Sequence, residues 1–161
     1  MLLLLGSTSP TESCRVDAND LADLYRLIRH FEGCHLTPYY CPAGVLTCGW
    51  GSTGPDVFPG RAWTQAYADQ RMEQDAKRFA IGALALCPSL SDAKLCAIAD
   101  FSYNLGLGRL KASTLRRKIN AGEWDAVPAE LRKWVNGGGK KLAGLVRRRE
   151  AEIALFIHRC Q

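Results

Sequence analysis

The chain has 161 residues, of which 47% are hydrophobic and 23% are charged, and its formal net charge is +5. These values are typical of one globular domain that can bury a core, and they exclude a disordered or fibrous chain. No stretch approaches the roughly 18 consecutive apolar residues of a membrane-spanning helix, so we expect no membrane span. The basic residues gather late in the chain. Such a surface favours anionic polymers, but charge alone does not separate a nucleic acid from a carboxylate-bearing wall polymer.

The N-terminus opens with MLLLL and continues as GSTSPTES. A secretory signal needs a positively charged start and about 7 to 15 apolar residues, and this segment has neither. We therefore expect residues 1–17 to form a flexible N-terminal arm, residues 18–161 to form a single domain, and the protein to accumulate in the cytoplasm.

The chain contains seven cysteines, an odd number that leaves at least one thiol unpaired. Some of them would pair in an oxidising compartment, but a core of this size does not need disulfides, so we favour reduced, buried cysteines. A zinc site at Cys34, His35, Cys41 and Cys48 is disfavoured, because these spacings lack the short C-x2-C element of zinc knuckles. We expect no metal and no organic cofactor.

The first predicted helix is capped by Asp20 and ended by Gly33. Its apolar positions follow the helical period: Leu21, Leu24, Leu27, Ile28 and Phe31. Glu32 therefore falls in the last turn, where the negative end of the helix dipole disfavours an ionised carboxylate. Such a place favours a retained proton, as a general acid requires.

Residues 36–53 alternate Tyr, Val, Thr and Trp with Pro and Gly, which predicts a small hairpin sheet with its turn at residues 42–44. Thr64 then caps a long helix that runs to about Leu86, and Pro88 ends it.

Beyond residue 89 the pattern predicts helices only. Ser91 and Ser113 each begin one, a further helix carries residues 127–135, and the last covers residues 145–157.

The most informative pattern is Glu32, Cys41 and Thr47 in the spacing Glu-x8-Cys-x5-Thr, followed by Gly49 and Gly51. Glycosidic hydrolysis needs a protonated carboxyl group on one side of the sugar and a group that steers or activates water on the other. A helix end and a facing turn hold two such groups apart.

This spacing resembles the active-site signature of the phage-type lysozymes (glycoside hydrolase family 24), in which the middle position is Asp or, in a subset, Cys. The resemblance continues through residues 101–122 and 144–156 and covers the chain from about residue 20 onward. It implies an α+β, lysozyme-like fold. A small N-terminal β-hairpin sheet lobe with the first helix would cover residues 18–63. A linking helix over 64–86 would join it to a mostly helical lobe over 87–161, with the cleft between the lobes.

The resemblance also implies roles for individual residues. Glu32 would be the general acid, and Cys41 and Thr47 would position or activate water. An arginine of the last helix lies against the glutamate in this family. Arg148 matches that position best, with its two arginine neighbours as alternatives. Cys41 itself remains open between base, nucleophile and a packed thiol.

Two further residues match positions that line the cleft in this family. Tyr39 and Asn104 would bind substrate together with Arg148, and Asn104 has a helix-capping role as its alternative. Among the four tryptophans, Trp50 is the candidate for stacking on a sugar, whereas Trp124 and Trp134 fit a core better.

The sequence thus predicts a phage or prophage endolysin, active as a monomer, that cleaves the β-1,4 bond between N-acetylmuramic acid and N-acetylglucosamine in peptidoglycan. It would wait in the host cytoplasm, depend on a membrane-permeabilising holin, and act on the cell wall in the periplasm. Alternatives are a lytic transglycosylase that uses Glu32 alone and an inactive wall-binding protein. We expect no nucleic-acid partner, because no recognition motif is present.

Overall fold

The computed structural model describes residues 18–158. The predicted arm over residues 1–17 lies outside this range, as do Cys14 and Cys160. The helices and strands follow in the order α1 Ala22–Glu32, β1 His35–Tyr40, β2 Leu46–Gly49, α2 Gln65–Leu86, α3 Asp92–Leu105, α4 Leu107–Ala112, α5 Thr114–Asn120, α6 Val127–Leu131, β3 Asn136–Gly137, β4 Lys140–Lys141 and α7 Ala143–Ile157. Short 3-10 turns, Ala18–Leu21 and Trp124–Ala126, precede α1 and α6.

Helix α1 begins at Ala22, one residue later than a cap at Asp20 predicts. Asp20 lies inside the 3-10 turn, and Leu21 occupies the N-cap position without a side-chain cap. The prediction of Asp20 as the cap was therefore wrong, because the chain already winds helically before α1. The predicted end is confirmed: Gly33 follows the last helical residue with φ +63°, a conformation that suits glycine.

Strands β1 and β2 form the predicted antiparallel hairpin, in which Tyr39 pairs with Thr47. The turn is closed by backbone hydrogen bonds from the Cys41 N–H to the Val45 oxygen (3.0 Å) and from the Gly44 N–H to the Cys41 oxygen (2.8 Å). Cys41 therefore sits at the mouth of the turn, directly after β1.

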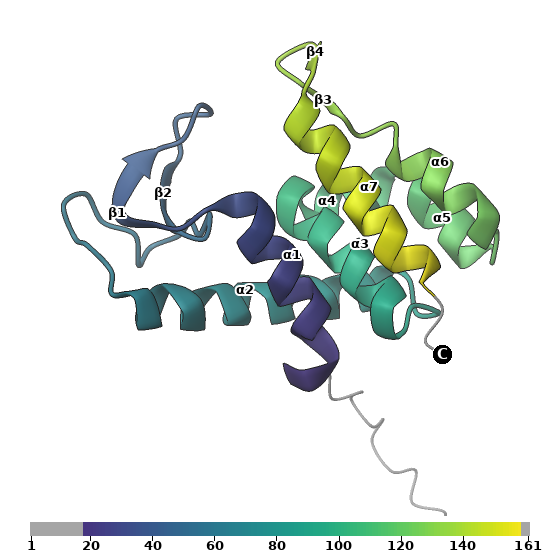
Figure 1. Ribbon diagram of the computed structural model, residues 1–161, viewed down its shortest axis with the longest axis horizontal. Helices are drawn as coiled ribbons and strands as arrows, with labels where there is room; N and C mark the ends of the chain where they lie inside the picture. Colours follow the sequence, from purple (N-terminus) through teal and green to yellow (C-terminus); the bar gives the residue numbers. More distant parts are fainter. Residues whose placement is uncertain (1–17, 159–161) are drawn as a thin grey trace, which may run out of the picture.

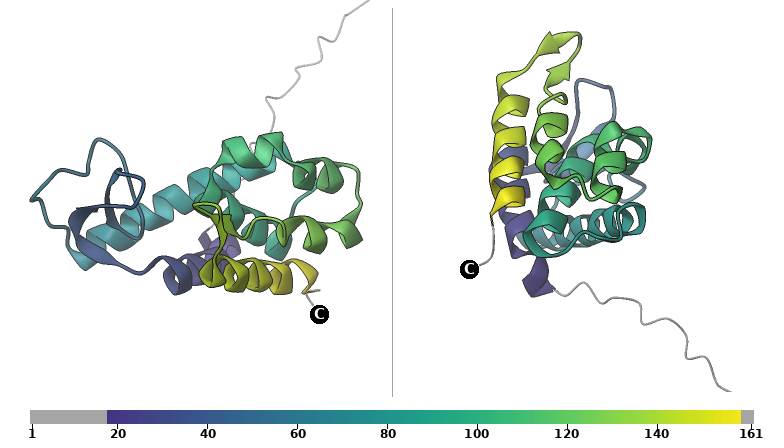
Figure 2. Two further views of the ribbon diagram at one scale, coloured as in Figure 1. Left: turned by 90° about the horizontal axis from the view of Figure 1, so that it is seen from above. Right: turned by 90° about the vertical axis from the view of Figure 1, so that its right-hand side faces the viewer.

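Helix α2 is the linking helix, and it runs from beneath the hairpin into the helical lobe (Figures 1 and 2). Thr64 caps it by accepting a hydrogen bond from the Tyr67 N–H. Its buried side chains enter three core clusters in turn: Ala68 packs under the hairpin, Met72 packs with α1, and Ala83 joins the helical lobe. One helix thereby holds the sheet lobe at a fixed place against the other helices.

The helical lobe is built around α3, which packs against both α2 and α7. Ser113 caps α5 as predicted. Two elements were missed. Helix α4 follows α3 after a break at Gly106, and its six residues are too short to show a period. Strands β3 and β4 form a small hairpin around two glycines with positive φ, so the prediction of helices only was wrong.

The predicted helix over residues 127–135 is also shorter than expected, because α6 ends at Leu131. Trp134 lies beyond it and packs, like Trp124, against the core of the helical lobe, as predicted.

The α+β, lysozyme-like architecture with a hairpin lobe and a helical lobe is confirmed. Within residues 18–158, no helix is both long and apolar enough to cross a membrane.

Candidate active site

Glu32 is the last residue of α1, and its side chain is 22% exposed. Gly51 approaches it closely, since a Cβ built on Gly51 would lie 3.2 Å from the Glu32 Oε2 atom. Gly51 also has φ +85°, which disfavours any other residue. The glycine that follows the Glu-x8-Cys-x5-Thr pattern thus leaves room for the carboxylate.

Arg148 on α7 holds the other oxygen of this carboxylate. Its Nη1 donates to Glu32 Oε1 at 2.5 Å, while its Nε and Nη2 donate to the two oxygens of Asp100 on α3 at 2.8 and 2.9 Å. Burial lowers the pKa of Arg148, but the hydrogen bonds and charges of Asp100 and Glu32 outweigh it and raise the pKa overall. The expected contact between Glu32 and an arginine of the last helix is therefore present, and Arg148 is the arginine that makes it. Its geometry is that of a group that orients the carboxylate.

The hairpin brings Cys41, Thr47 and Tyr39 together. Hydrogen bonds from the backbone of Val45 and Ala43 lower the pKa of the half-buried Cys41 thiol, and the Thr47 hydroxyl adds to this. The same hydroxyl donates to the Val45 carbonyl oxygen at 2.9 Å, and Thr47 is buried beside the thiol. Thr47 therefore lies on the Cys41 side of the site, with only 5% of the residue exposed.

Tyr39 connects the two halves of the site. Burial raises the pKa of its hydroxyl, and the negative charges of Cys41 and Glu32 raise it further. Tyr39 is 38% exposed and so remains open to a ligand. The carboxylate at the helix end and the thiol in the hairpin turn thus act on one common side chain.

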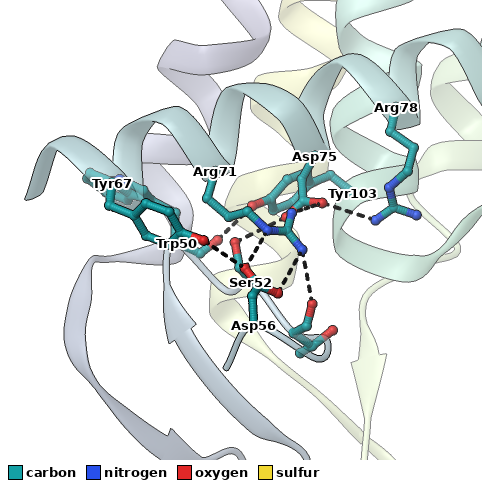
Figure 3. A network of polar contacts seen from close by, with 9 residues as sticks. Trp50, Ser52, Asp56, Tyr67, Arg71, Asp75, Arg78 and Tyr103 are labelled. Carbon is teal, nitrogen blue, oxygen red and sulfur yellow. Dashed lines mark hydrogen bonds and ion pairs between the residues drawn. The ribbon is translucent and has the colours of Figure 1, made fainter. Parts of the chain in front are cut away.

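The loop between Cys48 and Ser52 carries Gly51 toward Glu32, and helices α2 and α3 fasten it (Figure 3). Cys48 and Ser52 exchange backbone hydrogen bonds of 2.9 Å. The Ser52 hydroxyl donates to Asp75 at 3.1 Å, and the Tyr103 hydroxyl donates to the Trp50 carbonyl oxygen at 2.8 Å.

The indole of Trp50 is half-buried between two core clusters, and its Nε1 donates to Asp69 at 2.7 Å. This placement gives Trp50 a packing role in the loop, and its stacking on a sugar stays a prediction.

A groove of about 740 Å³ runs past Glu32 on the side of the helical lobe. Asn104 and Arg147 line it with Glu32, and Asn104 Oδ1 accepts a hydrogen bond from the buried Arg149 at 3.1 Å. Glu32 is the one carboxyl group among its lining residues, and none of those residues comes from the hairpin.

The sequence analysis did not single out Asp100 or Tyr103. Asp100 binds Arg148, and Tyr103 binds the backbone of the loop that carries Gly51, so both support the site from α3. Both lie on α3, where their positions fit a buried helix face. The helical spacing of Asp100, Tyr103 and Asn104 was the available signal, since it places all three toward one side of α3.

Within residues 18–158, the five described cysteines are free and no cluster of metal-ligating side chains occurs. Cys48, Cys87 and Cys96 are buried, and burial raises the pKa of each thiol. They behave as small core residues.

Comparisons with known proteins agree with this fold. A profile of the family described as "Phage lysozyme" matches residues 29–152. The endolysin of Bacillus phage B103 is 36% identical over 134 residues, which cover 81% of this chain and 51% of that protein. The SAR-endolysin of Bacteriophage PS119 is 36% identical over 122 residues, which cover 75% of this chain and 73% of that protein. The muramidase domain of SpmX from Asticaccaulis excentricus matches with a TM-score of 0.78 and 25% identity, over 86% of this chain and 97% of that one.

The fold and the glutamate held at the end of α1 define a lysozyme-like protein. The chain belongs to the phage lysozyme family. It spans about half the length of the Bacillus phage relative, and about three quarters of the SAR-endolysin.

Proposed function

We propose that this protein is an endolysin that hydrolyses the β-1,4 bond between N-acetylmuramic acid and N-acetylglucosamine in bacterial peptidoglycan. The observation that carries the proposal is the Glu32 carboxyl group, which reaches solvent in a groove while Arg148 binds one of its oxygens and Gly51 leaves room beside the other. Membership of the phage lysozyme family supports the substrate class.

In this mechanism Glu32 protonates the leaving glycosidic oxygen. The 22% exposure of its side chain allows it to regain a proton from solvent after each turnover. General acids of this kind contribute roughly 10² to 10⁴ in rate. Arg148 acts as a positioning residue, since two of its nitrogens are already bound to Asp100.

Cys41 takes the place that Asp has in most relatives of this signature, as the family resemblance implies. A thiol with a lowered pKa is ionised to a greater extent at neutral pH than an ordinary cysteine, so more thiolate is available to act as a base. The hydrogen bonds that lower the pKa of Cys41 come from the hairpin turn and Thr47. We propose that Cys41 and Thr47 together hold the attacking water, with inversion at the sugar carbon. Tyr39 and Asn104 bind sugar hydroxyls.

A lytic transglycosylase is the second candidate, because Glu32 is the one carboxyl group that lines its groove. Such an enzyme uses a single acid/base group and forms an anhydro sugar without water. Product analysis by mass spectrometry on defined peptidoglycan separates the two reactions, since their products differ by one water. A reducing-end sugar supports hydrolysis, and an anhydro sugar supports the transglycosylase. Absence of any product supports a wall-binding protein without activity.

The place of action follows from the substrate. We propose that the protein acts on the cell wall, as the family implies. We also propose that a holin releases it from the host cytoplasm and that it is a monomer. Fractionation of host cells before and after lysis tests the release, and sedimentation of the purified protein tests the monomeric state.

A further inference from the structure

Behind Glu32 lies a buried cluster of charged side chains from α3 and α7: Asp100, Arg148, Arg149 and Glu152. The side chains of Asp100, Arg149 and Glu152 are 0% exposed, and that of Arg148 is 4% exposed. Glu32 meets the cluster through Arg148. The groups that face Glu152 itself are Arg148 and Arg149 on its own helix and Asp100 on α3.

Glu152 is the unusual member of this cluster. Its Oε1 accepts a hydrogen bond from Arg149 Nη2 at 2.6 Å. Its Oε2 is buried and receives no hydrogen bond from any of residues 18–158. The nearest nitrogen of Arg148 stays 4.0 Å from Oε1, because Arg148 is bound to Asp100 by two shorter contacts. A buried carboxylate oxygen without a donor is costly, about 1 to 3 kcal/mol or more.

The charge balance of the cluster also indicates that one of its carboxyl groups is protonated. While Glu32 is ionised, as it is after it has given its proton to the substrate, three carboxyl groups face two guanidiniums, and the cluster carries a net charge of −1. Buried clusters are stable when their charges are matched, and arginine keeps its proton. One added proton on a carboxyl group makes the five side chains neutral.

Glu152 is the carboxyl group best placed to hold this proton. Asp100 uses both oxygens on Arg148, and Glu32 is the only one of the three that reaches solvent. Burial raises the pKa of Glu152 well above its usual range; the Arg149 charge opposes this, whereas the charge of Asp100 and a hydrogen bond with Asp100 add to it.

We propose that Glu152 is a neutral carboxylic acid whose Oε2–H donates to Asp100 and thereby fixes the Asp100–Arg148 pair that orients Glu32. The proton supplies Oε2 with a partner and removes the repulsion between two buried carboxylates. An ionised Glu152 would instead repel Asp100 and attract Arg148. Glu152 is thus a positioning residue, and its effect on turnover rests on the proposed role of Glu32.

Glutamine and leucine at position 152 test this assignment. In Glu152→Gln the amide oxygen can accept from Arg149 and the amide NH2 can donate to Asp100, as the protonated acid does. We expect this variant to keep wall-lysing activity and its pH profile. Glu152→Leu has a similar size but no donor. We expect its kcat to fall about 10- to 100-fold with little change in KM, because Arg148 shifts relative to Glu32.

Infrared spectroscopy supplies a readout that is independent of activity. At neutral pH the difference spectrum between wild type and Glu152→Gln should show the C=O band of a buried protonated carboxyl group, because any band of Glu32 is common to both proteins and cancels. Absence of this band from the difference spectrum overturns the assignment. So does a Gln variant whose activity falls like that of Leu or whose pH profile moves.

If Glu152→Leu does not fold, the comparison of wild type with Gln still decides the protonation state. A folded Leu variant with full activity removes the positioning role. If the band behaves as expected while Glu32→Gln stays active, the proposed function fails and the neutral Glu152 stands.

Discussion

At the scale of single residues, the proposed site combines the carboxyl group of Glu32 with the thiol of Cys41, at a position where the family resemblance implies a second carboxyl group as the usual residue. The hairpin turn offsets part of this difference, since its backbone donors and Thr47 lower the pKa of Cys41. A thiolate therefore forms at lower pH than in an ordinary cysteine, and activity that needs it should rise with pH through the lowered pKa.

Replacement of Cys41 by aspartate tests whether this residue serves water. Asp is a stronger acid and stays ionised at neutral pH, so Cys41→Asp should keep or raise the rate of wall lysis. Cys41→Ala should lose about 10²-fold, the low end of general-base contributions. Turbidity of purified wall suspensions measures both. An inactive Asp variant together with a sugar adduct on wild-type Cys41 in intact mass would show a nucleophilic thiol instead.

At the scale of elements, the loop from Cys48 to Ser52 sets how closely the backbone approaches Glu32. Gly51→Ala places a methyl group 3.2 Å from Glu32 Oε2 at φ +85°. The backbone strain should cost about 1 to 3 kcal/mol of stability. Activity should also fall about tenfold or more, because small displacements at a reacting group are costly. Urea unfolding and wall lysis measure the two effects.

Gly60→Ala is the matched control for this change. Gly60 has a similar φ of +78°, but a Cβ there would meet nothing within 4 Å. We expect a similar loss of stability and unchanged activity. Equal losses of activity in the two variants would mean that strain alone explains Gly51→Ala.

The elements also show what the sequence predicts well. Long periodic helices with cap residues, such as the one that follows Thr64, appear at the predicted bounds because capping and burial agree there. Helix α4 and the β3–β4 hairpin were missed, since a helix of six residues and strands of two residues each carry too little pattern. Asp20 failed as a cap because the preceding residues already form a 3-10 turn.

The site was predictable only in part for a related reason. Spacing along the chain singled out Glu32, Cys41 and Thr47, which lie at the end of α1 and in the hairpin that follows it. The partners that hold Glu32 from behind come from α3 and α7, far along the chain, and only packing brings them there. Arg148 was found through the family resemblance, whereas Asp100 was missed, because its helical spacing from Asn104 indicates a shared side of α3 but not a contact with Arg148.

At the scale of the whole molecule, a polar network fastens the sheet lobe to α2 (Figure 3). Arg71 forms ion pairs with Asp75 on its own helix and with Asp56 of the loop, the latter at 2.9 Å. Arg71→Met leaves the buried Asp75 with weaker partners and should destabilise the protein by about 2 to 4 kcal/mol. Arg132→Met removes an exposed pair with Glu150 and should cost less than about 1 kcal/mol. Urea unfolding compares them, and equal losses would contradict the role of the network.

The same network predicts a pH dependence. Burial raises the pKa of Asp56, but hydrogen bonds from Arg71 outweigh this and hold the pKa below its usual value. A lowered folded-state pKa adds stability above the unfolded-state pKa of about 4, and this stability is lost as the pH falls through the folded value. The stability difference between wild type and Arg71→Met should therefore shrink below about pH 4. A constant difference down to acid pH would contradict the contribution of Asp56.

The central claim of this account is that Glu32 protonates the glycosidic oxygen, and Glu32→Gln tests it most directly. Glutamine keeps the shape of the side chain but has no acidic proton to give. With the fold verified by circular dichroism, lysis of purified peptidoglycan should fall by at least about 10²-fold relative to wild type. A folded Glu32→Gln protein that keeps more than about a tenth of the wild-type rate would contradict the claim.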